Sequence, residues 1–217
     1  MDGRADAAEG TREPLLTFGH GTAGEEELAG LLGGARVGAV VDVRTAPGSR
    51  RNPDAGRDAL ARWLPGRGLG YRWEQRLGGF RRAAPDSPDT FWENASFRGY
   101  AGYTRDPAFL AAMEELLRES ARTRTAVMCA ESVWWRCHRR IVADFAVLAR
   151  GVEVFHLMHD GRLTPHRPTP GARLREDGLL VYDVRDDVRD DVPDDKDTGN
   201  TGNTGTAGNT GSGRHGG

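Results

Sequence analysis

Residues 37–44 have the sequence VGAVVDVR, and this short stretch decides the fold class. It is almost entirely apolar and rich in β-branched side chains, which is the pattern of a strand that is covered on both faces. Such strands occur in parallel sheets, where crossover helices lie on both sides. The stretch therefore predicts an α/β fold built on a buried, mostly parallel sheet.

The segments around this strand alternate between short apolar runs and helical patterns. We expect strands at 14–20, 37–44, 70–74, 124–130 and 152–159, and helices at 23–35, 52–66, 106–120 and 136–151. The predicted architecture is a Rossmann-like three-layer sandwich whose mostly parallel sheet has about five strands. The order of the strands does not follow from these patterns.

Length and composition indicate one globular domain, at residues 14–184. A chain of 217 residues with 37% hydrophobic content supplies one ordinary core but hardly two. Residues 1–13 form a polar leader, and residues 185–217 are first acidic and then rich in Gly, Asn and Thr. Because these two ends have almost nothing apolar to bury, we expect them to be disordered.

Charge, cysteine content and hydropathy exclude several classes of protein. A net charge of −2 does not call for a polyanionic partner, and two cysteines do not make a disulfide framework. No apolar segment approaches the roughly 20 residues of a membrane span, and the first residues do not have a signal-peptide pattern. We therefore expect a cytoplasmic protein without a membrane partner; the oligomeric state is not predicted.

Polar side chains follow four of the predicted strands, at the point where each strand ends. In open parallel sheets, functional groups gather beyond the carboxyl ends of the strands. Four ordinary loops would also contain polar residues, but we expect a shared cleft. The polar residues at these ends are His20, then Asp42 and Arg44 with Arg50 and Arg51 in the next loop, then Glu74, and finally Cys129 and Glu131.

The segment MCAESVWWRCHRR, residues 128–140, contains both cysteines. Cys129 ends a strand shortly before a predicted helix N-terminus, an environment that lowers the pKa of a thiol. It is therefore a candidate nucleophile, although a strand-end cysteine can equally be a small buried filler. His138 could accept the thiol proton and Glu131 could act as general acid and base, or the two could serve as a half-buried residue and a helix cap. Cys137 falls on the apolar stripe of the helix, which predicts buried packing.

We expect no metal and no cofactor. The spacing C-x7-C-H lacks the close C-x2-C pair of structural zinc sites. The spacing from Cys129 to Arg136, C-x6-R, is one residue longer than the C-x5-R loop of phosphatases and rhodaneses. Arg136 and Arg139 near a helix start oppose the helix dipole, which indicates that they face an anion or a carboxylate.

Aromatic and basic residues alternate in YRWEQRLGGFRR (71–82) and in FWENASFRGYAGY (91–103). Single-stranded nucleic-acid grooves use this mixture for stacking and phosphate contacts. The alternative, which we favour, is that these aromatic residues pack a long excursion onto the edge of the sheet. Tyr100 and Tyr103 are three residues apart and could share one helical face near the cleft.

Six segments together resemble the domain of unknown function 488 family, in the same order and at similar separations: TFGHGT, VVDVRTAPGSRRNP, RLGGFRR, FRGYAGYT, MCAE and WRCHRRIVAD. The resemblance covers about residues 15–160. It implies a compact bacterial α/β domain whose signature residues cluster at strand ends, and it supplies no established reaction. Carried over by position, those residues are His20, Asp42, Arg44, Arg50, Arg51, Gly78, Gly79, Tyr100, Cys129, Glu131, Cys137, His138 and Arg139.

The sequence therefore predicts a cleft for an anionic, phosphate-bearing or nucleotide-like ligand, in a thiol-dependent hydrolase or transferase. The catalytic candidates are Cys129, Glu131 and His138, supported by Asp42, Tyr100 and Cys137. The anion-binding candidates are His20, Arg44, Arg50, Arg51, Arg136 and Arg139. Two alternatives stay open: a non-catalytic nucleic-acid or nucleotide binding module, and a redox-sensing thiol protein.

Overall fold

A computed structural model describes residues 13–48 and 52–183 of the chain. The chain divides into two units, residues 1–187 and 188–217, and all described residues belong to the first. The predicted disordered tail, the predicted leader except for its last residue Glu13, and the predicted anion-binding residues Arg50 and Arg51 lie outside the described residues.

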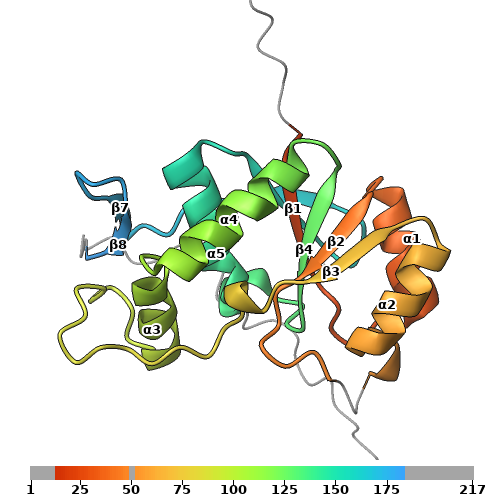
Figure 1. The fold of residues 1–217 in the computed structure, drawn as a ribbon, viewed down its shortest axis with the longest axis horizontal. Helices are drawn as coiled ribbons and strands as arrows, with labels where there is room; N and C mark the ends of the chain where they lie inside the picture. Colours follow the sequence, from red (N-terminus) through yellow and green to blue (C-terminus); the bar gives the residue numbers. More distant parts are fainter. Residues whose placement is uncertain (1–12, 49–51, 184–217) are drawn as a thin grey trace, which may run out of the picture. The chain divides into compact units, whose positions relative to one another are not determined.

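A six-stranded sheet forms the centre of the first unit, in the order β3-β2-β4-β1-β5-β6 (Figure 1). Neighbouring strands run parallel from β3 to β5, and β6 pairs antiparallel with β5 at the edge. The predicted α/β sandwich with a mostly parallel sheet is confirmed, and β6 makes it one strand wider than expected. The strands are β1 (Leu15–Gly19), β2 (Ala39–Asp42), β3 (Gly70–Trp73), β4 (Thr125–Cys129), β5 (Val154–Leu157) and β6 (Leu163–Pro165).

Helices cover both faces of the sheet and create two hydrophobic cores. Helices α1 (Glu25–Gly34) and α2 (Arg57–Gly66) contribute Leu28 and Leu60 to one core, which also contains Leu16 of β1. Helices α4 (Pro107–Ser120) and α5 (Arg139–Asp144) cover the other face, where the core contains Leu15. Successive residues of one strand thus face opposite layers, as the pleat of a strand requires.

The helix predicted at 136–151 is divided in the structure. A 3₁₀ turn, η3 (Trp134–Arg136), precedes α5, and α5 continues into a π-helical turn at Phe145–Ala149. Two further 3₁₀ turns, η1 (Pro53–Ala55) and η2 (Gln75–Leu77), follow β2 and β3. The segment between β4 and α5 is therefore an irregular loop of short turns, not the first turn of a long helix.

Three strands and one helix were not predicted. Helix α3 (Ala95–Tyr103) begins at Asn94, whose side chain accepts hydrogen bonds from the Ser96 and Phe97 amides, an N-cap. The strands β7 (Ala172–Leu174) and β8 (Leu180–Tyr182) form a separate antiparallel hairpin. In Figure 1 these elements lie at the left of the view, on the side of α4 and α5 away from the sheet.

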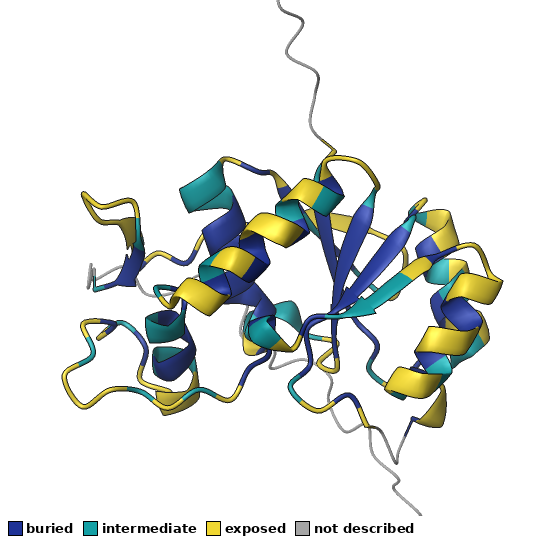
Figure 2. Ribbon diagram, in the orientation of Figure 1, coloured by how far each residue is buried: buried dark blue, intermediate teal, exposed yellow. Residues whose placement is uncertain are grey.

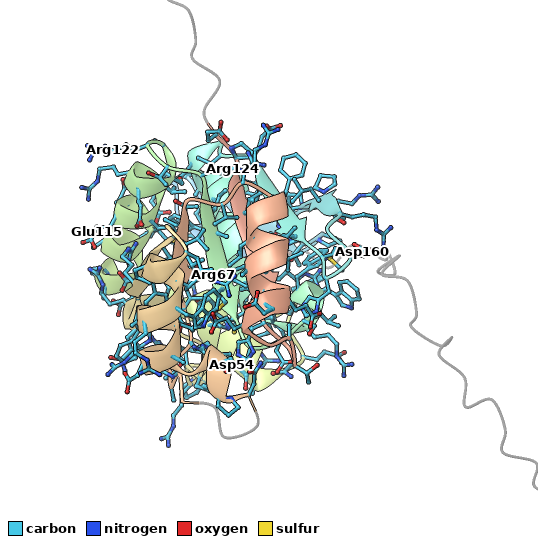
Figure 3. All side chains as sticks on the ribbon, turned by 90° about the vertical axis from the view of Figure 1, so that its right-hand side faces the viewer. Asp54, Arg67, Glu115, Arg122, Arg124 and Asp160 are labelled. Carbon is cyan, nitrogen blue, oxygen red and sulfur yellow. The ribbon has the colours of Figure 1, made fainter. Side chains whose placement is uncertain are left out.

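Burial follows this layered arrangement. The central strands are buried, whereas the outward faces of the helices are exposed (Figure 2). Charged side chains such as Glu115, Arg122 and Asp160 project from the outer surface (Figure 3). Among the described residues, the search for membrane spans finds no helix with the length and apolar character to cross a bilayer.

Candidate functional site

The carboxyl ends of the four parallel strands β3, β2, β4 and β1 lie together at one end of the sheet. Gly19 of β1 pairs in register with Cys129 of β4, and Asp42 of β2 pairs with Met128. Asp42 also pairs with Trp73, the last residue of β3. The segments that follow these strands therefore start at the same level, which brings together side chains from distant parts of the sequence.

Two sulfurs and one imidazole nitrogen meet at this edge. The Nδ1 atom of His138 lies 3.9 Å from Sγ of Cys129 and 3.7 Å from Sγ of Cys137. The ligand atoms of these three residues all lie within 4.8 Å of one another. We call this group the Cys129–Cys137–His138 cluster. It joins the end of β4 to the loop before α5.

The two thiols of the cluster have opposite acidities. A hydrogen bond from Cys129, supported by the nearby His138 ring, lowers the pKa of Cys137 well below its usual range. The same hydrogen bond, together with burial, raises the pKa of Cys129. The Nε atom of Arg139 also donates to Sγ of Cys137 at 3.4 Å. These contacts therefore favour deprotonation of Cys137 over deprotonation of Cys129.

The ring of His138 is held from two sides. Its Nε2 atom lies 3.2 Å from the carbonyl oxygen of Val43, so Nε2 carries the proton and donates. The ring of Tyr100 packs edge-on against it, with the ring centroids 5.0 Å apart. The Tyr100 hydroxyl is not directed at the sulfurs, because it donates to the carbonyl oxygen of Leu77 at 2.7 Å. Tyr100 thus positions the ring.

A cavity of about 350 Å³ opens above the cluster. We call it the strand-end pocket. Both cysteines and His138 line it, and its remaining wall comes from the loops after β2, β3 and β4 and from the start of α3. The other lining residues are Arg44, Thr45, Ala46, Gly79, Phe80, Asn94, Ser96, Phe97, Tyr100, Ala130, Glu131 and Arg136.

Arg44 lies in the wall of the pocket but is already engaged. Its Nε and Nη2 atoms donate to the two carboxylate oxygens of Asp42, at 2.8 and 2.6 Å, and both side chains are buried. Its Nη1 atom donates to Nε2 of His20 at 3.1 Å. Burial, and then the charge of Arg44, lower the pKa of His20. His20 is therefore a neutral support for Arg44, outside the pocket lining.

Arg136 and Glu131 are the exposed charged side chains of the pocket wall. The Arg136 guanidinium makes no hydrogen bond or ion pair with any residue in the described part of the chain. Arg139 has a different position: it is 1% exposed and donates to Sγ of Cys137 and to the carbonyl oxygen of Glu131. Of the predicted anion-binding residues that the structure describes, Arg136 is thus the one with a free guanidinium at the pocket.

The sequence analysis did not name Phe80, Asn94, Ser96 and Phe97 as site residues, although they line the pocket. Asn94 and Ser96 belong to the start of α3, and the N-cap pattern at Asn94 was the signal for that helix. Phe80 is 86% exposed and has φ of 59°, in the left-handed region that non-glycine residues rarely adopt. An exposed aromatic ring in this conformation at the pocket mouth had no sequence signal.

A buried polar chain behind the pocket was also missed. His156 in β5 receives a 2.7 Å contact from the Thr17 hydroxyl and lies 3.0 Å from His166. His166 is 2.9 Å from the Asp144 carboxylate, which also accepts a 2.9 Å hydrogen bond from the Tyr182 hydroxyl. This series of hydrogen-bonded side chains links the sheet, α5 and the hairpin. Its members are far apart in the sequence, so no local pattern predicted it.

No curated protein and no solved structure is similar enough to this chain to match it. The family model described as Domain of unknown function DUF488 matches residues 25–146. The matched segment runs from α1 into the π-helical turn and contains the whole Cys129–Cys137–His138 cluster. Because the match covers more than half of the 217 residues, the chain belongs to the DUF488 family.

Proposed function

We propose that this chain is a thiol-dependent enzyme that acts on a small phosphate-bearing anion in the strand-end pocket. The observation that carries the proposal is the position of the Cys129–Cys137–His138 cluster on the wall of a cavity of about 350 Å³. A cavity of this size accommodates a small molecule rather than a macromolecule. Reactive sulfurs, a histidine and a free cation in one cavity favour chemistry over packing alone.

The anion-binding part of the proposal rests on Arg136. Its guanidinium is exposed at the pocket, and its planar fork suits phosphate oxygens. Arg44 adds positive charge from behind, although Asp42 neutralises most of it. Asn94 and Ser96 lie on the same wall and can donate neutral hydrogen bonds. Arg139 contributes indirectly, through Cys137 and the Glu131 carbonyl.

The chemical part rests on the cluster and on Glu131. The sulfurs of Cys129 and Cys137 form the reactive centre, and His138 is held beside both. Glu131 carries an exposed carboxylate on the same wall and serves as general acid and base for the bound ligand. Two free thiols stay reduced in the cytoplasm, which is the compartment that this chemistry requires.

The aromatic rim indicates what else the ligand carries. Phe80 and Phe97 line the pocket together with the polar groups, and Phe80 is almost fully exposed. An exposed ring offers a stacking face for a flat apolar group such as a nucleobase. We therefore propose that the ligand is nucleotide-like, with its phosphate at Arg136 and its base at Phe80.

The first test measures binding and turnover with adenosine monophosphate, ribose 5-phosphate and inorganic phosphate as probes. Arg136→Gln should weaken binding about tenfold to hundredfold, because it removes a charge-assisted hydrogen bond. Arg122→Gln is the matched control: it removes an exposed arginine near the opposite, amino-terminal edge of the sheet and should change nothing. Equal losses in both variants would mean that binding is non-specific.

The second test separates an enzyme from a binding module. Cys129→Ser should abolish turnover, which is measured by phosphate release and by mass spectrometry. Probe binding should stay within about twofold of the wild type. A non-catalytic nucleic-acid or nucleotide module would be indifferent to this change and would show a steep salt dependence. A redox sensor would turn over none of the probes, and its thiols would respond to peroxide instead.

A further inference from the structure

We propose that Cys129, Cys137 and His138 bind a zinc ion through Sγ, Sγ and Nδ1, with the fourth coordination position facing the strand-end pocket. This inference rests on the proposed function, because it names the cofactor of the same reactive centre. It departs from the expectation drawn from the C-x7-C-H spacing. That spacing excludes a zinc knuckle, which needs two cysteines close together in the sequence. The fold nevertheless brings the three residues together in space.

The three residues come together because the chain returns sharply after β4. Cys129 is the last residue of the strand, and the irregular loop through η3 brings Cys137 and His138 back beside it. The backbone of this loop is fixed by hydrogen bonds, since the Arg139 guanidinium donates to the carbonyl oxygen of Glu131. The three ligand atoms therefore occupy fixed positions without the two-residue spacing of a zinc knuckle.

The two sulfur-to-nitrogen distances of the cluster fit a tetrahedral ion. Zinc binds thiolate sulfur at about 2.3 Å and imidazole nitrogen at about 2.0–2.1 Å, so a tetrahedral site separates S and N by about 3.6 Å. The two observed separations, from Nδ1 of His138 to the sulfurs, are 3.9 and 3.7 Å. Both lie within about 0.3 Å of that value. Small movements of side chains would complete the site.

The orientation of the His138 ring supports the same conclusion. Metal-binding histidines commonly donate their second ring N–H to a carbonyl or carboxylate, which fixes the tautomer. In this protein Nε2 donates to the carbonyl oxygen of Val43, which leaves the lone pair of Nδ1 directed at the two sulfurs. The Nε–H of Arg139 donates to Sγ of Cys137, an outer contact that balances thiolate charge.

The chemistry of the ligands selects the class of metal. Two thiolates and one imidazole suit zinc and other borderline or soft ions, whereas calcium and magnesium prefer oxygen. Three protein ligands with an open fourth position are typical of catalytic zinc sites, because structural sites use four. All three residues line the pocket, so a ligand held at Arg136 reaches the open position. A zinc ion there would polarise a phosphate oxygen.

The experiment loads the full-length, reduced chain with zinc or with cobalt(II) after removal of metal by a chelator. We expect one metal ion per chain and, for cobalt, an intense near-ultraviolet thiolate charge-transfer band. Cys137→Ser and His138→Gln should each lower affinity by more than the roughly 10–100-fold that loss of an outer contact costs. His159→Gln is the matched control, because His159 donates to Gly19 at the same sheet edge but lies outside the cluster, and it should bind metal normally.

A measurement on the unmodified chain covers the case in which a variant does not fold. X-ray absorption at the zinc edge should show two sulfur neighbours at roughly 2.3 Å and nitrogen or oxygen neighbours at about 2.0–2.2 Å. A shell of oxygen and nitrogen alone would overturn the inference, as would a wild-type chain that binds no stoichiometric zinc. Formation of a Cys129–Cys137 disulfide in place of zinc binding under reducing conditions would also overturn it.

The two proposals fail separately. Arg136→Gln should bind the nucleotide probe more weakly, as stated above, and keep its zinc, since Arg136 is not a ligand of the ion. If zinc does not bind but Cys129→Ser still abolishes turnover, the thiols act without a metal, and the inference falls while the proposed function stands. If zinc binds to the two sulfurs but no probe binds or reacts, the zinc site stands and the proposed function falls.

Discussion

The indole ring of Trp134 stacks on the imidazole of His156, with the ring centroids 3.9 Å apart and the planes 9° from parallel. Trp134 belongs to η3, in the loop that carries Arg136 and Cys137, whereas His156 lies in β5. The stack therefore attaches the loop of the pocket to the sheet. It also covers His156, which is 1% exposed.

This burial makes stability depend on pH. Desolvation, and then the neighbouring charge of His166, lower the pKa of His156 from 6.5 to about 2. The unfolded chain therefore binds a proton below pH 6.5 that the folded chain does not, and the free energy of unfolding falls as pH decreases from 6.5 toward 2. The slope from this residue approaches about 1.4 kcal/mol per pH unit.

We expect His156→Gln to flatten that dependence. Urea unfolding at pH 7, 6 and 5 should show the variant losing less stability across the series than the wild type, whatever its stability at pH 7. His159→Gln, at an exposed histidine, should follow the wild-type slope. Parallel curves for wild type and His156→Gln would show that His156 is not the residue responsible.

Gly19 permits the close approach of β1 to the loop of the pocket. A β-carbon at Gly19 would overlap with the carbonyl oxygen of Glu131 and would lie 2.9 Å from Nη2 of Arg139. We expect Gly19→Ala to lower the free energy of unfolding by about 1–3 kcal/mol and to displace the loop. A β-carbon at Gly30 in α1 would meet open space, so Gly30→Ala should raise the free energy of unfolding by about 0.5–1 kcal/mol. Thermal unfolding of the two variants compares them directly, and a stable Gly19→Ala would contradict the contact.

Removing one partner of the buried Asp42–Arg44 ion pair should lower the free energy of unfolding strongly. Asp42→Asn leaves the guanidinium buried without its carboxylate, which we expect to cost about 3–5 kcal/mol in chemical denaturation. The exposed pair of Arg173 and Asp183 is the comparison, with N–O distances of 2.7 and 2.6 Å. Asp183→Asn should cost less than about 1 kcal/mol because solvent screens that pair. Similar costs at both sites would mean that Arg44 finds another partner.

We expect the backbone conformation of Phe80 to lower stability and its ring to contribute to ligand binding. Its φ of 59° is unfavourable for phenylalanine but not for glycine, and its ring makes few contacts because it is 86% exposed. We expect Phe80→Gly to leave stability unchanged or to raise it by up to about 1 kcal/mol. The same variant should bind adenosine monophosphate about tenfold more weakly and bind inorganic phosphate normally. A loss of stability without any effect on the nucleotide would indicate a structural role.

The sequence predicted the sheet because its strands are continuous apolar runs. The expected strands at 37–44 and 124–130 became β2 and β4, each shorter at its ends. Helix α3 was missed because Gly99 and Gly102 lower helix propensity, and packing overrides this: a β-carbon at Gly99 would overlap with the backbone of Arg81. Strands β6 to β8 have three residues each, too few for a periodic pattern.

Several of the predicted site residues line the pocket, among them Cys129, Glu131 and His138, but the sequence did not reveal how they are arranged. Strand-end position identified Cys129 and Glu131, and helical periodicity assigned Cys137 to the core. Cys137 is indeed buried, at 3% exposure, yet it also lines the pocket. The predicted helix start at residue 136 gave no indication of this pocket position. In the structure the turn η3 changes the direction of the chain just before Cys137. The pairing of Arg44 with Asp42 and His20 is a matter of three-dimensional proximity that spacing did not reveal.

Strand β4, which ends at Cys129, has a parallel neighbour on each side. Interior strands of this kind belong to the last region of a domain to open in hydrogen exchange. A ligand that contacts Cys129 in the pocket should therefore raise the free energy of unfolding of the entire α/β unit, and not only order a loop. Saturation at a hundred times the dissociation constant would add about 2.7 kcal/mol to that cooperative transition.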